Sequence, residues 1–77
     1  MTRTVITVFR VLPPVLGEWE LYRGSRELGR YDDKTSAVAE GRRLARENMP
    51  SRLIVHRSNG QIEDEIAFPD DSLAEPA

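Results

Sequence analysis

Residues 33–62 read DKTSAVAEGRRLARENMPSRLIVHRSNGQI, and this stretch decides the fold. Its first half has the period of an amphipathic helix over about 34–48, because small and apolar residues recur three and four positions apart. Its second half predicts two strands, 52–57 and 61–68, because Asn59-Gly60 between apolar runs is a strong hairpin signal. The residues that share the inner helix face are Ala37, Val38, Gly41, Leu44, Ala45 and Asn48.

The predicted helix has clear ends and one unusual inner position. Asp33 supplies an N-cap, since its short side chain can accept a backbone hydrogen bond and its charge suits the positive end of the helix dipole. Pro50 stops the helix. Gly41 costs the helix about 1 kcal/mol relative to alanine. We therefore expect a close approach to the helix backbone there, by the sheet or by the indole of Trp19, and predict that the Trp19 ring packs near Gly41.

Three strands are predicted upstream of this stretch. Residues 4–12 (TVITVFRVL) are apolar on both faces, which is typical of a central or doubly covered strand, and Pro13-Pro14 ends it. Residues 18–23 (EWELYR) alternate, so that Trp19 and Leu21 point inward. A turn at Gly24-Ser25 leads to a short third strand, ELGRY, over 27–31, which Gly29 weakens.

The predicted last strand, 61–68, does not alternate regularly between apolar and polar residues. Asp64 falls on the predicted inner face, so a β-bulge or an early sheet edge is expected near it. Glu63 and Glu65 are predicted to share a solvated face opposite Asp64. The apolar residues of this strand that are predicted to face the core are Ile62, Ile66 and Phe68.

The element order is therefore β-β-β-α-β-β, an α+β fold with one helix packed on a small, mostly antiparallel sheet. The 77 residues suffice for a single domain, predicted over residues 1–68. Residues 69–77 (PDDSLAEPA) have the composition of an acidic, disordered C-terminal tail. The formal net charge of −2 combines a basic body over residues 1–62 with an acidic end over residues 63–77.

The composition also excludes several function classes. Without cysteine there is no disulfide, thiolate metal site or cysteine nucleophile, and a single histidine excludes a multi-histidine metal site. No apolar run approaches the roughly 20 residues that span a bilayer. We therefore expect a cytoplasmic protein with no metal, no cofactor and no membrane partner.

The chain resembles the small bacterial family catalogued as domain of unknown function 2188. The resemblance covers about residues 5–68 and lies in the order of its features: a strand that ends at proline, G-x-W, the capped helix KTSAVAEGRRLARE, and LIVHRSNGQI. Asp33 stands where the family pattern has threonine, a change that keeps the capping chemistry. The resemblance implies a cytoplasmic bacterial protein, but it implies no activity and no catalytic residues.

The search for chemistry leaves few candidates. His56 is the one plausible general base, and a lone strand histidine is more often a half-buried packing residue than a catalyst. On the helix, Arg43 has acidic partners at helical spacing in Glu40 and Glu47, whereas Arg42 and Arg46 have none. Arg42 and Arg46 could bind phosphate or an acidic partner, with Arg52 and Arg57 extending the patch. Alternatively, they could form a solubilising face of the helix.

Two functions follow from these residues. The first is a non-enzymatic interaction module that binds another protein, with sheet edges that could accept a strand or a second copy as a weak homodimer. The alternative is a nucleic-acid-binding module that uses the helix edge of Arg42 and Arg46 with Arg52 and Arg57. The sequence pI of about 5.3 speaks against the alternative.

Overall fold

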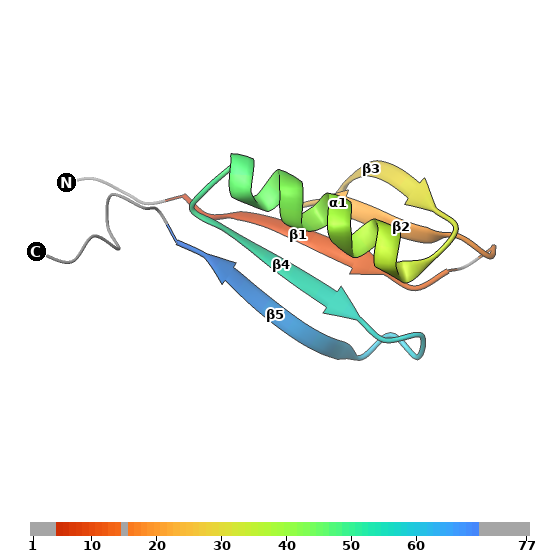
Figure 1. Cartoon of the computed structure of the whole chain (residues 1–77). Coiled ribbons are helices and arrows are strands. Elements are labelled where there is room, and N and C mark those ends of the chain that lie inside the picture. The colour runs from red at the N-terminus through yellow and green to blue at the C-terminus, as the bar shows by residue number, and fades with distance from the viewer. Residues whose placement is uncertain (1–4, 15, 70–77) are drawn as a thin grey trace, which may run out of the picture.

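The computed structural model describes residues 5–14 and 16–69, and they form the predicted order of elements (Figure 1). A single helix lies across one face of a five-stranded sheet. The elements are β1 (Thr7–Leu12), β2 (Trp19–Arg23), β3 (Arg26–Tyr31), α1 (Lys34–Glu47), β4 (Ser51–His56) and β5 (Ile62–Phe68).

The sheet has the strand order β3-β2-β1-β4-β5, and its centre is a parallel pair. β1 and β4 run parallel, with Phe9 opposite Leu53, whereas the other three pairings are antiparallel. The prediction of a mostly antiparallel sheet is confirmed. The helix supplies the crossover that a parallel pair requires. Three strands precede the helix and two follow it, and each group contributes one strand of the central pair.

The helix begins and ends close to the predicted positions. The carboxylate of Asp33 accepts a hydrogen bond from the backbone N–H of Ser36 at 2.7 Å, which is the predicted N-cap. At the other end the Asn48 side-chain amide donates to the carbonyl of Leu44 at 2.7 Å. The buried Ser51 hydroxyl donates to the carbonyl of Ala45 at 2.5 Å and ties the last turn to the start of β4.

The helix approaches the sheet most closely at Gly41. A Cβ atom there would lie 2.9 Å from Leu53 Cδ1 and 3.3 Å from Leu21 Cδ1, and both leucines are fully buried. Glycine is therefore needed because the sheet itself approaches. The prediction that Trp19 packs at Gly41 is wrong, since two aliphatic side chains occupy that place.

Part of the predicted first strand is not strand. Val5 and Ile6 precede β1 and are exposed, because no neighbouring strand pairs with them in the described residues. Residue 4 and residues 70–77 lie outside the described residues, and with them most of the predicted disordered tail.

The predicted bulge is present at the start of β5, and it changes which side chains face the core. The register shifts so that Val55 pairs with Asp64 and His56 with Ile62. Ile62 therefore turns away from the helix and is 53% exposed, which corrects the prediction that it faces the core. The bulge also separates Glu63 from Glu65, which were predicted to share a face.

In the hairpin between β4 and β5, the Arg57 N–H donates to the Gln61 carbonyl at 2.6 Å, and the loop that they close ends in glycine. Gly60 has a φ of +91° and donates its N–H to the carbonyl of Arg57 at 2.8 Å. The Asn59 side chain accepts the N–H of Gln61 at 3.0 Å. The hairpin predicted from Asn59-Gly60 is confirmed.

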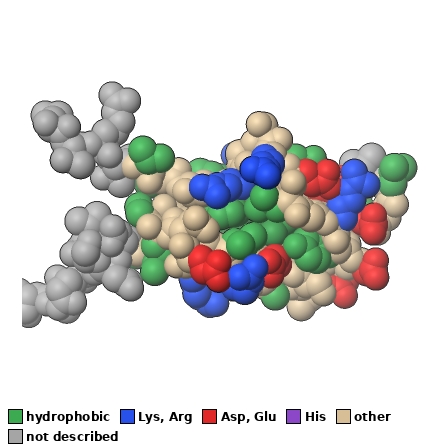
Figure 2. Space-filling model, turned by 90° about the horizontal axis from the view of Figure 1, so that it is seen from above, with side chains coloured by type: hydrophobic (Ala, Val, Ile, Leu, Met, Phe, Trp, Pro, Cys, Tyr) green, Lys and Arg blue, Asp and Glu red, His purple; other side chains and the backbone are tan. Residues whose placement is uncertain are grey.

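The helix is narrower than the sheet, so the core stays open at its margins. Figure 2 shows hydrophobic side chains at the centre of one surface, bordered by basic and acidic ones. The partly buried apolar residues around the core are Trp19, Tyr31, Val38, Leu44, Ile66 and Phe68.

Within residues 5–14 and 16–69, no helix has the length and apolar character needed to cross a membrane.

Candidate functional site

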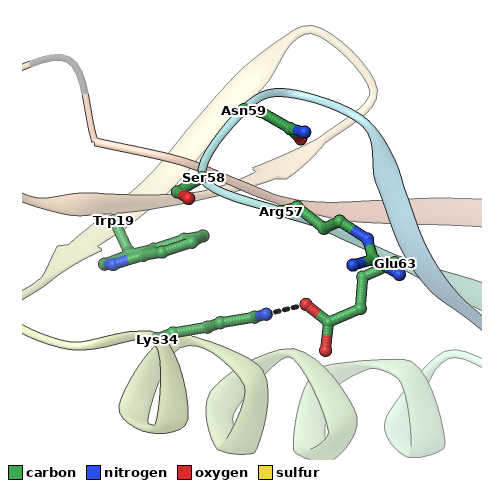
Figure 3. Close-up of a pocket in the computed structure, with 6 residues that line it drawn as sticks. All are labelled: Trp19, Lys34, Arg57, Ser58, Asn59 and Glu63. Atoms are coloured by element: carbon green, nitrogen blue, oxygen red, sulfur yellow. Dashed lines mark hydrogen bonds and ion pairs between the residues drawn. The ribbon is translucent and has the colours of Figure 1, made fainter.

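A pocket of about 380 Å³ lies where the start of α1 meets the β4–β5 hairpin (Figure 3). Its walls come from three elements and a loop that are distant in sequence. Trp19 opens β2, Lys34 opens α1, and Glu63 belongs to the bulge of β5. The full lining is Trp19, Lys34, Arg57, Ser58, Asn59 and Glu63.

Three charged side chains meet in this pocket. The Lys34 ammonium donates a hydrogen bond to the Glu63 carboxylate, and Figure 3 shows the Arg57 side chain extending from the hairpin toward Glu63. The hydrogen bond from Lys34 holds the pKa of Glu63 below its usual range, and the Arg57 charge adds to this effect. Two cations therefore face one anion, and the pocket has a surplus of positive charge.

Trp19 forms the aromatic wall of the pocket. It is half-buried, and the Lys34 Nζ atom lies 5.6 Å from the centre of its ring, within the range of a cation–π contact. The side chain thus packs at the margin of the core, with part of its surface left to the pocket.

The four arginines singled out from the sequence do not form one surface. Arg52 lies on the sheet face away from the helix, since its neighbour Leu53 packs under Gly41, and it pairs with Glu65 at 3.0 Å. The Arg46 guanidinium lies 5.9 Å from the centre of the Phe68 ring, at the opposite end of the helix from Arg57. Neither Arg42 nor Arg46 forms an ion pair with another residue of the described ranges.

The remaining helix arginine is neutralised as predicted. Arg43 donates to Glu40 at 2.5 and 3.0 Å and to Glu47 at 2.8 Å, so both predicted partners are engaged. This leaves Arg42 and Arg46 as the basic edge of the helix on its β5 side.

Both ring nitrogens of His56 form hydrogen bonds. Arg10 lies 3.2 Å from its Nε2 atom and the carbonyl of Gly60 lies 2.9 Å from its Nδ1 atom. A guanidinium can only donate and a carbonyl can only accept, so Nε2 accepts and Nδ1 carries the proton. His56 is half-buried and ties β1 to the hairpin loop, in agreement with the packing interpretation.

The two edges of the sheet differ in how they are protected. β3 is interrupted by a bulge, and a Cβ at Gly29 would lie 2.9 Å from the Tyr31 hydroxyl, so the Tyr31 ring folds over this glycine. β5 has its bulge at its start and pairs regularly with β4 from Asp64 to Phe68, and no described residue pairs with its outer side. The outer side of β5 is therefore the more open edge.

Sequence reasoning missed half of the residues that line the pocket. Lys34 and Glu63 lie 29 positions apart and meet only because the helix packs across the sheet. One signal was available, since the bulge expected at Asp64 is what turns Glu63 toward the helix. Of the residues that line the pocket, Trp19, Arg57 and Asn59 were identified from the sequence.

The comparisons with known proteins give one finding. Residues 9–68 match the model of the family described as "Uncharacterized protein conserved in bacteria (DUF2188)", which covers most of the chain. No curated protein and no solved structure gave a match. The chain therefore belongs to this bacterial family, as the order of its strands, capped helix and Asn-Gly hairpin had indicated.

Proposed function

We propose that this protein is a small non-enzymatic module that binds an extended segment of another protein by strand addition to β5. The observation that carries the proposal is the outer edge of this strand, which is regular from Asp64 to Phe68. An exposed edge of this kind presents unpaired N–H and C=O groups that an incoming strand can use. The proposal places the module in the bacterial cytoplasm, in keeping with a chain that has no cysteine.

The direction of the backbone groups identifies the residues that would receive the partner. Thr7 donates its N–H to the carbonyl of Pro50 at 3.2 Å, which sets the hydrogen-bonding pattern between β1 and β4. Because backbone groups alternate in direction along a strand, Leu53 directs its own toward β5. The N–H and C=O groups of its partner Ile66 point back toward β4, so those of Glu65 and Ala67 point outward.

The surroundings of this edge favour a partner with acidic side chains. The Arg46 guanidinium lies over the Phe68 ring at the end of β5, and Arg42 lies one helical turn before it. Neither has an ionic partner in the described part of the chain. Acidic side chains on an added strand would supply such partners, at the same time as the backbone groups pair.

The experiment uses proline to remove one outward donor. In Ala67→Pro the lost N–H faces solvent, so the β4–β5 ladder keeps its hydrogen bonds while an incoming strand loses one. Arg30→Pro on β3 is the matched control, because Arg30 holds the equivalent outward position at the other edge. Peptides are first selected from a random display library against the full chain, and their affinities are then compared among the three proteins.

We expect the selected peptides to bind the Arg30→Pro protein normally and the Ala67→Pro protein at least tenfold more weakly. Binding should also slow hydrogen exchange at the Glu65 and Ala67 amides. Peptides that bind the Ala67→Pro protein as well as the parent would contradict the β5 site. Sedimentation that shows a dimer sensitive to Ala67→Pro would instead identify a second copy of the chain as the occupant.

A further inference from the structure

The pocket beside α1 has a charge that its own residues do not balance. Lys34 and Arg57 contribute two positive charges to the lining, whereas Glu63 contributes one negative charge. A phosphate monoester carries about −1.5 to −2 charges near pH 7 and three acceptor oxygens. It would therefore match an ammonium and a guanidinium better than a single carboxylate does.

Glu63 is placed so that its carboxylate can move away from Lys34. Its side chain is 42% exposed, and it stands in the bulge of β5, where the ladder to β4 is interrupted. Its removal from Lys34 would leave no charge buried, because the Lys34 side chain is itself 31% exposed. The carboxylate thus occupies the position of an incoming anion without being part of the core.

The rest of the pocket suits a planar ring. Trp19 is the single tryptophan of the chain, and it lies at the pocket wall with the Ser58 side chain next to it (Figure 3). The volume of about 380 Å³ falls within the range of small-molecule sites. Indole rings also stack with nucleobases without regard to base identity.

We propose that this pocket binds the phosphate end of a nucleotide. The phosphate displaces Glu63 and contacts Lys34 and Arg57, and the base lies against Trp19. The site is separate from the outer edge of β5 used in the proposed function. Loss of peptide binding in Ala67→Pro would leave nucleotide binding unchanged.

The test is a titration followed by ¹H–¹⁵N NMR, because the single tryptophan gives one indole N–H signal. Adenosine monophosphate is compared with inorganic phosphate and with adenosine, which separate the phosphate from the ring. We expect saturable shifts of the Trp19 indole and the Arg57 and Ser58 amides with adenosine monophosphate, and at least tenfold weaker binding of the two fragments. Lys34→Met and Arg57→Met should each weaken binding at least fivefold.

Glu63→Gln provides the sharpest comparison. It removes the competing carboxylate, so adenosine monophosphate should bind up to about fivefold more tightly, the range of an exposed ion pair. Glu65→Gln is the matched control, since it removes the same charge from the same strand on the opposite sheet face, where Glu65 pairs with Arg52. The control should leave the affinity within about twofold of the parent protein.

Three results would overturn the proposal. Equal binding of adenosine and adenosine monophosphate would show that the cations play no part. Equal effects of Glu63→Gln and Glu65→Gln would reduce the interaction to overall charge, and the absence of shifts at millimolar nucleotide would remove the site. A short 5′-phosphorylated single strand that binds more tightly than the free nucleotide would support the site and identify a strand end as its source.

Discussion

Gly41 shows how a single residue sets the distance between helix and sheet. An isolated helix would favour alanine there by about 1 kcal/mol. The two leucine side chains below it leave no room for a Cβ, however, since Leu53 Cδ1 would lie only 2.9 Å away. Overpacking of this kind costs about 1–3 kcal/mol, which outweighs the gain in helix propensity.

We therefore expect Gly41→Ala to lower the free energy of unfolding by about 1 kcal/mol, measured by chemical denaturation. The effect of Gly41→Ala on the free energy of unfolding should change sign when the obstructing methyl group of Leu53 is removed. In a Leu53→Val background, where the nearest methyl group is missing, Gly41→Ala should raise the free energy of unfolding by up to about 1 kcal/mol. Stabilisation by Gly41→Ala in the parent protein would show that the leucines yield without cost.

At the scale of elements, the helix start carries a prediction of pH dependence. The hydrogen bond from the Ser36 backbone holds the pKa of Asp33 below its usual value of about 3.9. A carboxyl whose pKa is lower in the folded than in the unfolded state stabilises the fold above the unfolded value. That contribution is lost as the pH falls through the folded value.

The free energy of unfolding of the parent protein should therefore exceed that of Asp33→Asn at neutral pH, and the difference should shrink below about pH 4. Other carboxyls with lowered pKa values, Glu40 and Glu63, titrate in both proteins and cancel in the comparison. Asp32→Asn serves as the control, because it removes a carboxyl from the same turn without touching the cap. A difference that stays constant with pH would contradict this role of Asp33.

Comparison of the predicted with the observed elements shows which parts of the fold the sequence can predict. The helix was predicted closely because its cap, its period and Pro50 are local signals, and Asn59-Gly60 marked the hairpin for the same reason. The parallel neighbours β1 and β4 could not be predicted, since pairing between distant strands depends on tertiary packing. Ile62 was misplaced because one extra residue in a bulge reverses every side chain before it.

At the scale of the whole molecule, stability should be graded from the centre of the sheet outward. β1 and β4 have a strand on each side and the helix above them, whereas in the described part of the chain β3 and β5 have a strand on one side only. Hydrogen exchange should therefore be slowest at the β4-facing amides of β1, such as Phe9, and fastest at Arg30, Glu65 and Ala67. Protection at the outer amides of β5 equal to that of β1, without added ligand, would indicate self-association.

The parallel pair at the centre also has a consequence for synthesis on the ribosome. The first three strands emerge as an incomplete sheet, because the place beside β1 belongs to a strand that follows the helix. Until residues 51–56 leave the exit tunnel, Phe9 and Val11 lack the neighbours that bury them. The nascent chain therefore acquires its structure late and in one step, and a premature stop codon before β4 would release a polypeptide for proteases to remove.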